Sequence, residues 1–288
     1  MSFVLNELET CVSFFQYDVW TTIVPGMLAA SSGIEAWQGS FYDIIVKLLK
    51  AWTYIWLYAT TFTMSNQIYG INEDAINKPF RPLVTGRLTI QDAIVRWRFY
   101  TVWFLCMGAF LGVLPECLLW IGLTIIYNVY GGSKWWWFRS LFIGLGTWAQ
   151  LAAQYKITHH DLSPIKRLWF ANISVMFAIL IHIQDFRDVE GDKLESRKTL
   201  PILLGTWNAK LLMSIFLICA IIFNHYVLYP LVGQDSFSAY ENIANLLFML
   251  ITYRLLRFHD KESDQQTYRC LELWFTVMLL ETVWFKLE

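Results

Sequence analysis

The first stretch of the sequence that could do chemistry covers residues 65–87, SNQIYGINEDAINKPFRPLVTGR. Three potential oxygen ligands, Asn66, Glu73 and Asp74, stand there at i, i+7 and i+8. Residues at this spacing share one face of a continuous helix. The two prolines that follow, at positions 79 and 82, are expected to end that helix.

A second acidic stretch covers residues 184–201, QDFRDVEGDKLESRKTLP. Asp185, Asp188 and Asp192 are spaced i, i+3 and i+7, which again predicts one helical face. Gly191 is a position at which the helix could end or bend beside the third carboxylate. His182, one turn before Asp185, could orient a ligand or could simply be a satisfied histidine.

Carboxylates in a row repel one another, so a cation must compensate them near a membrane. Mg²⁺ takes oxygen ligands and often links one or two carboxylates to substrate phosphates. Basic residues stand just beyond each cluster, where they could contact phosphate oxygens: Lys78, Arg81, Arg197 and Lys198. Together these features predict a Mg²⁺-dependent diphosphate site. The alternative for either stretch taken alone is a solvated loop.

The segments around these stretches are those of an integral membrane protein. The chain of 288 residues is 56% hydrophobic and only 16% charged, against about 25% charged in soluble domains. A spanning helix needs about 20 mostly apolar residues. Nine segments are candidates: 15–34, 43–65, 97–114, 116–131, 137–155, 167–185, 207–229, 240–257 and 268–287.

Both acidic stretches follow an even-numbered segment, so we expect them on the same side of the membrane, where they could act on one ligand. Loops and helix ends on that side carry sixteen Lys and Arg residues against six on the other, which predicts a cytoplasmic location. No long linker interrupts residues 1–288, which we interpret as one domain. The net charge of -1 argues against a nucleic-acid partner. No feature indicates an obligate protein partner.

The two stretches resemble the paired signatures of the UbiA superfamily of intramembrane prenyltransferases. Residues 66–86 are similar to the first signature, NxxxDxxxD with a basic segment, and residues 185–201 to the second, which ends in TLP. The resemblance implies nine transmembrane helices around a central cavity, with both motifs at its cytoplasmic mouth. It further implies that Mg²⁺ and a prenyl diphosphate bind there and that an allylic cation forms.

The resemblance also implies roles for individual residues. The metal ligands would be Asn66, Glu73, Asp74, Asp185, Asp188 and Asp192, and three of them, Asp74, Asp185 and Asp188, are the expected catalytic residues. The diphosphate would contact Lys78, Arg81, Lys134, Arg197 and Lys198. The sequence departs from the family at Gly70, where the middle Asp of the first signature is expected, and Glu73 is the candidate replacement.

That altered first signature looks most like a fungal branch of the superfamily that includes membrane terpene cyclases. We therefore expect a cyclase acting on farnesyl or geranylgeranyl diphosphate in terpenoid metabolism, in the endoplasmic reticulum membrane. The alternative is transfer of the prenyl group to an aromatic or other small acceptor. A transporter or a non-catalytic lipid-binding protein would leave the paired carboxylates without a purpose.

Overall fold

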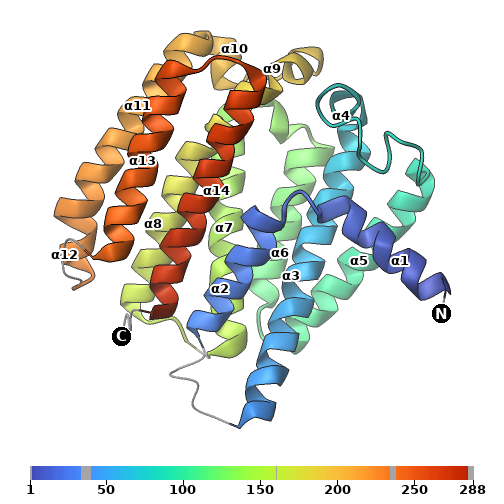
Figure 1. Ribbon diagram of the computed structural model, residues 1–288. Helices are drawn as coiled ribbons and strands as arrows, with labels where there is room; N and C mark the ends of the chain where they lie inside the picture. The colour runs from blue at the N-terminus through green and yellow to red at the C-terminus, as the bar shows by residue number, and fades with distance from the viewer. Residues whose placement is uncertain (1, 34–39, 160, 234–237, 285–288) are drawn as a thin grey trace. The chain divides into compact units, whose positions relative to one another are not determined.

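The computed structural model describes residues 2–33, 40–159, 161–233 and 238–284, and in these ranges the chain is helical, without a β-strand (Figure 1). The α-helices are α1 (Ser2–Phe15), α2 (Val24–Ser32), α3 (Phe41–Tyr69), α4 (Ile71–Asn77), α5 (Ile90–Phe110), α6 (Leu114–Thr124), α7 (Trp136–Thr158), α8 (Pro164–Leu180), α9 (Asp185–Leu194), α10 (Leu200–Leu204), α11 (Thr206–Phe223), α12 (Tyr229–Leu231), α13 (Ala239–Arg257) and α14 (Lys261–Trp284). Short π-helical or 3-10 turns join some of them: η1 (Val19–Ile23), η3 (Ile125–Val129), η4 (Gly132–Lys134), η5 (Ile181–Ile183) and η6 (Asn224–Leu228).

Each of the nine segments expected from the sequence contains a helix within the described residues. Residue 34 of the first segment and residues 285–287 of the last lie outside the described residues. Two helical segments, Pro164–Ile183 and Thr206–Leu231, are long and apolar enough by length and composition to cross a membrane. The helical fold class is therefore confirmed, and the number of spans stays a prediction.

The chain divides into two compact units, and α7 contributes to both of them. One unit contains residues 1–133 and 149–160, and the other contains residues 134–148 and 161–288. The first acidic stretch lies in the first unit and the second acidic stretch in the second. The interpretation of the chain as one domain stays a prediction.

In the first unit, aromatic side chains of α3, α5 and α6 form the core that supports the first acidic stretch. Ser40 begins α3 with a capping box, in which its hydroxyl and the Asp43 side chain bond each other's backbone N–H. Further along, Tyr58 stacks on Trp120 at 4.0 Å between ring centroids, and Trp120 Nε1 donates to the Tyr58 carbonyl. This packing holds the helix that leads into Asn66.

In the second unit, α8, α11, α13 and α14 run alongside one another (Figure 1). Phe177 of α8 stacks on Phe275 of α14 at 4.4 Å, and Phe248 of α13 stacks on Trp274 at 4.8 Å. The helix with the second acidic stretch, α9, packs against α10 and α14. A group of packed helices thus carries the three aspartates.

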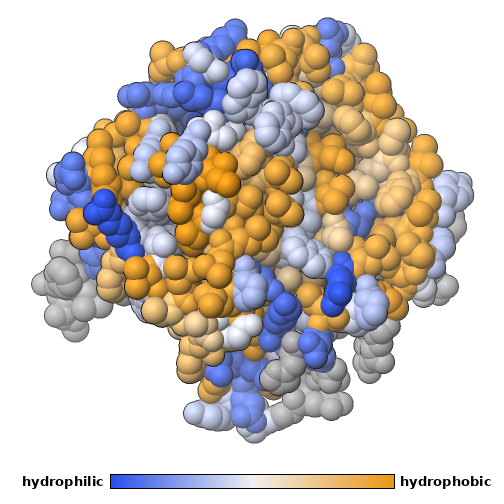
Figure 2. All heavy atoms as spheres, turned by 180° about the vertical axis from the view of Figure 1, so that it is seen from behind, coloured by the Kyte–Doolittle hydropathy of each residue, from blue (hydrophilic) through white to orange (hydrophobic). Residues whose placement is uncertain are grey.

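Large hydrophobic side chains are also exposed over much of the surface, and Figure 2 shows broad hydrophobic areas on one face. Examples with more than half of their area exposed are Trp20, Phe99, Phe110, Tyr130, Val175 and Tyr226. Monomeric soluble proteins rarely expose apolar patches of more than a few hundred Å². The exposed apolar surface is therefore consistent with the membrane protein that the sequence predicts.

The close approach of α5 and α6 yields a test of the packing. A Cβ atom on Gly108 would lie 2.3 Å from Cys117 Sγ, so we expect Gly108→Ala to lower the free energy of unfolding by about 2 kcal/mol through overpacking. Thermal unfolding of the purified protein in detergent measures this effect. Adding Cys117→Ala should restore part of the loss.

Gly122→Ala is the matched control, since nothing lies within 4 Å of a Cβ at that helical position. It should leave stability unchanged or slightly raised, because alanine is the better helix former. Equal losses for the two glycine substitutions would contradict the proposed close contact.

Candidate functional site

The first acidic stretch is built on two helices that meet at Gly70. Helix α3 ends at Tyr69 and α4 starts at Ile71, and Gly70 between them has φ -111° and ψ 18°. The expectation that Asn66, Glu73 and Asp74 share one continuous helical face is therefore wrong. Glycine, which destabilises helix interiors, stands where the chain leaves α3.

Gly70 also has little room for a side chain. A Cβ there would lie 2.8 Å from the carbonyl oxygen of Asn66, which already accepts a hydrogen bond from the Gly70 N–H. A backbone atom cannot move aside as the end of a flexible side chain can. Glycine in place of the family's Asp at this position therefore removes a possible metal ligand, and it also suits a backbone that has little room for a Cβ atom.

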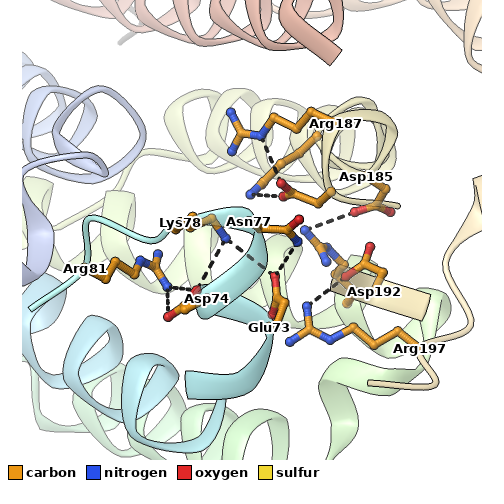
Figure 3. Close-up of polar contacts among 12 residues, drawn as sticks. Glu73, Asp74, Asn77, Lys78, Arg81, Asp185, Arg187, Asp192 and Arg197 are labelled. Atoms are coloured by element: carbon orange, nitrogen blue, oxygen red, sulfur yellow. Dashed lines mark hydrogen bonds and ion pairs between the residues drawn. The ribbon is translucent and has the colours of Figure 1, made fainter. Parts of the chain in front are cut away.

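The two carboxylates of α4 are buried and paired with cations of the same stretch (Figure 3). Arg81 Nη1 lies 2.7 Å from both carboxylate oxygens of Asp74. Lys78 Nζ lies 3.6 Å from Glu73 Oε1 and 3.9 Å from Asp74 Oδ1. Burial raises the pKa of Asp74 above its usual value, while Arg81 and Lys78 act in the opposite direction.

Helix α4 ends at Asn77, as the prolines predicted. Lys78, the residue before Pro79, has φ -142° and ψ 60° and so lies outside the helical region, in line with the restriction that proline places on its predecessor. This turn brings Lys78 and Arg81 back toward Asp74. Asn66, on the last turn of α3, is half-buried.

The second acidic stretch forms the helix that its spacing predicted. Asp185, Asp188 and Asp192 all lie on α9, with 0%, 4% and 0% of their areas exposed. The helix does not end at Gly191, because α9 continues through Gly191 to Leu194. Gly191 is itself buried.

Each of these three aspartates has an arginine beside it. Arg139 Nη2 lies 3.0 Å from Asp185 Oδ1, Arg187 Nε 3.6 Å from Asp188 Oδ1, and Arg197 Nη1 3.1 Å from Asp192 Oδ1. Figure 3 shows Arg197 beside Asp192. The charges of the stretch are thus compensated within the second unit.

Lys134 and Lys198, two lysines expected at the diphosphate, are joined by a backbone hydrogen bond. The Lys198 N–H donates to the Lys134 carbonyl at 2.7 Å, and the Trp136 N–H donates to the Lys198 carbonyl at 3.3 Å. The Lys198 ammonium group lies over the Trp135 ring, 4.1 Å from its centroid. The fold therefore brings Lys134, 64 positions earlier in the chain (198 - 134), next to the end of the second stretch.

The donor atoms suit Mg²⁺, although no group of three or more His, Cys, Asp or Glu side chains among the described residues converges as a metal site. The candidate ligands are carboxylate and amide oxygens, which Mg²⁺ prefers. One of them, Asp185 Oδ1, is buried and accepts no hydrogen bond within the described residues, despite the nearby Arg139. The residues fit a metal that also takes oxygens from water and diphosphate.

Sequence reasoning missed two of the cations, Arg139 and Arg187, as members of the second site. Arg187 is adjacent to Asp188 in sequence, and neighbours at i, i+1 do not normally face each other on a helix. Arg139 stands 46 positions before Asp185 (185 - 139). Its one signal in the sequence was a charge near the start of an apolar segment, which usually has a functional reason.

Substitutions at Asp74 and Arg81 test whether the buried carboxylate of the first stretch needs its arginine partner. Their side chains are only 2% and 8% exposed, so Arg81→Ala should lower the free energy of unfolding by about 3 kcal/mol by leaving a buried charge unpaired. The double variant with Asp74→Ala should lose less than the two single variants together. Chemical denaturation in detergent gives these values.

The exposed pair of Arg87 and Glu9, 47% and 70% exposed, is the control. Arg87→Ala should cost less than about 1 kcal/mol, because water screens such a pair. Equal losses of unfolding free energy in Arg81→Ala and Arg87→Ala would contradict the larger contribution expected of the buried pair.

Several known proteins are similar to this chain over most of its length. The chain is 30% identical to the somaliensene A/B synthase of Streptomyces somaliensis, over 98% of this chain and 94% of that protein. It is 31% identical to the diterpene cyclase eriG of Hericium erinaceus (96% and 88%) and 27% identical to the polyprenyl transferase eriF of the same fungus (96% and 94%).

The fold also matches solved structures. A UbiA homolog from Archaeoglobus fulgidus bound to GPP and Mg²⁺ superimposes with a TM-score of 0.65 at 13% identity, covering 95% of this chain and 99% of that one. The UbiA prenyltransferase family itself matches residues 19–277. The resemblance seen in the two acidic stretches is thus confirmed, and the chain belongs to the UbiA prenyltransferase family.

Proposed function

We propose that this protein is a terpene cyclase that ionises farnesyl or geranylgeranyl diphosphate with the help of Mg²⁺ and closes the resulting cation into a ring. The observation that carries the ionisation step is the row of three buried aspartates on α9, each beside an arginine. Such a row has both the oxygen ligands for a metal and the cations for a diphosphate. The sequence relatives named as a synthase and a cyclase support the second step.

The residues that would hold the metal are Asn66, Glu73, Asp74, Asp185, Asp188 and Asp192. When bound, Mg²⁺ supplies positive charge that stabilises a departing diphosphate. Basic residues in and beside the two stretches would bind the phosphate oxygens by charge-assisted hydrogen bonds. The basic residues proposed for this role are Lys78, Arg81, Lys134, Arg197 and Lys198.

The reaction starts when the bond between C1 of the prenyl chain and the diphosphate oxygen breaks, and the electron pair leaves with the diphosphate. Cations already in place at the developing negative charge stabilise this step without reorganising. The allylic cation then forms a carbon–carbon bond with one of its own double bonds. Loss of a proton gives a hydrocarbon, and capture of water gives an alcohol with release of a proton.

Two features favour cyclisation over transfer. The relatives named as cyclase or synthase match this chain at 30–31% identity, and the first acidic stretch has Gly70 and Glu73 where the family signature differs. The second candidate function is transfer of the prenyl group to an aromatic or other small acceptor. The similarity to a polyprenyl transferase over 96% of this chain favours it.

The proposed setting is the endoplasmic reticulum membrane, crossed nine times by one domain, with both acidic stretches facing the cytoplasm. The exposed apolar side chains and the two long apolar helical segments support a membrane location. The excess of Lys and Arg on the side of the acidic stretches supports the orientation. That both stretches serve one diphosphate is a prediction from the sequence.

The deciding experiment supplies membranes that contain the protein with Mg²⁺ and either farnesyl or geranylgeranyl diphosphate alone, and identifies the products by mass spectrometry. We expect a cyclic hydrocarbon or alcohol without an acceptor. Asp185→Asn and Asp192→Asn should reduce turnover by at least about a hundredfold, since each removes a charge from the ionisation site. Asp260→Asn, an exposed position outside both stretches, is the control and should keep full activity.

Product that forms only after an aromatic acceptor is added would establish the transferase instead. Full turnover by either α9 variant would show that these aspartates do not serve the ionisation.

A further inference from the structure

A buried histidine connects the first turn of α7 to the second acidic stretch. His182 lies in the short turn η5 between α8 and α9 and is 2% exposed. Its Nδ1 lies 2.9 Å from Asp185 Oδ2, and its Nε2 lies 2.8 Å from Ser140 Oγ. Both ring nitrogens of His182 therefore have partners, and all three residues belong to the second unit.

The first turn of α7 contacts this group at several points. Trp136, Arg139 and Ser140 stand at i, i+3 and i+4, which places them on one face of the helix. The Trp136 ring lies edge-on to the His182 ring at 6.1 Å between centroids. Arg139 contacts Asp185 Oδ1, so the two oxygens of this carboxylate face different partners.

The hydrogen-bond roles follow from the chemistry of the groups. An ionised carboxylate can only accept, so Nδ1 of His182 carries the proton that it donates to Asp185 Oδ2. In the neutral ring Nε2 then accepts from the Ser140 hydroxyl, which can donate. The Asp185 carboxylate thus selects the tautomer of His182, and the Ser140 hydroxyl, which can donate or accept, satisfies the second ring nitrogen.

We propose that His182, held by Ser140, is a positioning residue that fixes the orientation of the Asp185 carboxylate, so that Oδ1 faces Arg139 and keeps the orientation in which it would bind a metal. This inference rests on the proposed function, in which Asp185 is a metal ligand. Groups behind a ligand that set its orientation commonly change metal affinity by about 10- to 100-fold when they are removed. Without the bond to Nδ1, the carboxylate can rotate and pair both oxygens with Arg139.

The test compares two substitutions that each keep one end of the ring. Asn at position 182 places an amide donor near the former Nδ1, whereas Gln places its amide near the former Nε2. The purified full-length protein in detergent is melted over a series of Mg²⁺ concentrations at a fixed concentration of inorganic diphosphate. The Mg²⁺ concentration for half of the maximal rise in Tm is the readout, which does not depend on turnover.

We expect His182→Asn to stay within about twofold of the wild-type value, and His182→Gln and His182→Ala to need about tenfold more Mg²⁺. Ser140→Ala should fall between them, because it loosens the ring without removing the donor to Asp185. In the activity assay, His182→Gln should regain turnover at high Mg²⁺ concentration, which a purely structural defect would not.

Equal Mg²⁺ requirements of the Asn and Gln variants would overturn the positioning role, and this comparison stands even if His182→Ala fails to fold. An unchanged requirement in a folded His182→Ala protein would overturn it as well. If the wild-type protein itself gains no stability from Mg²⁺ with inorganic diphosphate, the proposed metal site fails and the positioning role fails with it. Stabilisation of the wild type with equal responses of the variants refutes only the positioning role.

Discussion

A buried ionised carboxylate needs a compensating charge, because transfer from water costs several kcal/mol. Five carboxylates of the two acidic stretches are buried in this protein, and an arginine or lysine of the same unit contacts each of them. This requirement shapes the chain around the stretches. The cations come from the turn after α4, from Arg139 on α7, and from Arg187 and Arg197 in or just after α9.

The same requirement connects stability with the proposed chemistry. The cations that neutralise the carboxylates are of the kind that a diphosphate binds, and the carboxylates are of the kind that Mg²⁺ binds. Mg²⁺ with a diphosphate would bring both a positive and a negative charge. Ion pairs between residues of the protein could then be replaced by pairs with this ligand, with little change in net charge. Groups already oriented in this way stabilise a leaving group without the cost of reorganisation.

The second acidic stretch was predictable from sequence because its three aspartates lie within the ten residues of one helix. Periodicity alone places Asp185, Asp188 and Asp192 on one face, and the structure agrees. The first stretch was less predictable, because its expected face extended across Gly70. Helical spacing holds only while the helix continues, and the backbone leaves α3 at that glycine.

The sequence by itself determined the helical class, the family and most of the candidate residues, because these depend on hydropathy and on short spacings along the chain. Tertiary structure alone decided which cation pairs with which carboxylate. Arg139, Ser140 and Lys134 come from segments far from the second stretch, and only packing brings them to Asp185, His182 and Lys198, respectively. Contacts between distant segments depend on how helices pack, and local sequence patterns carry no record of that packing.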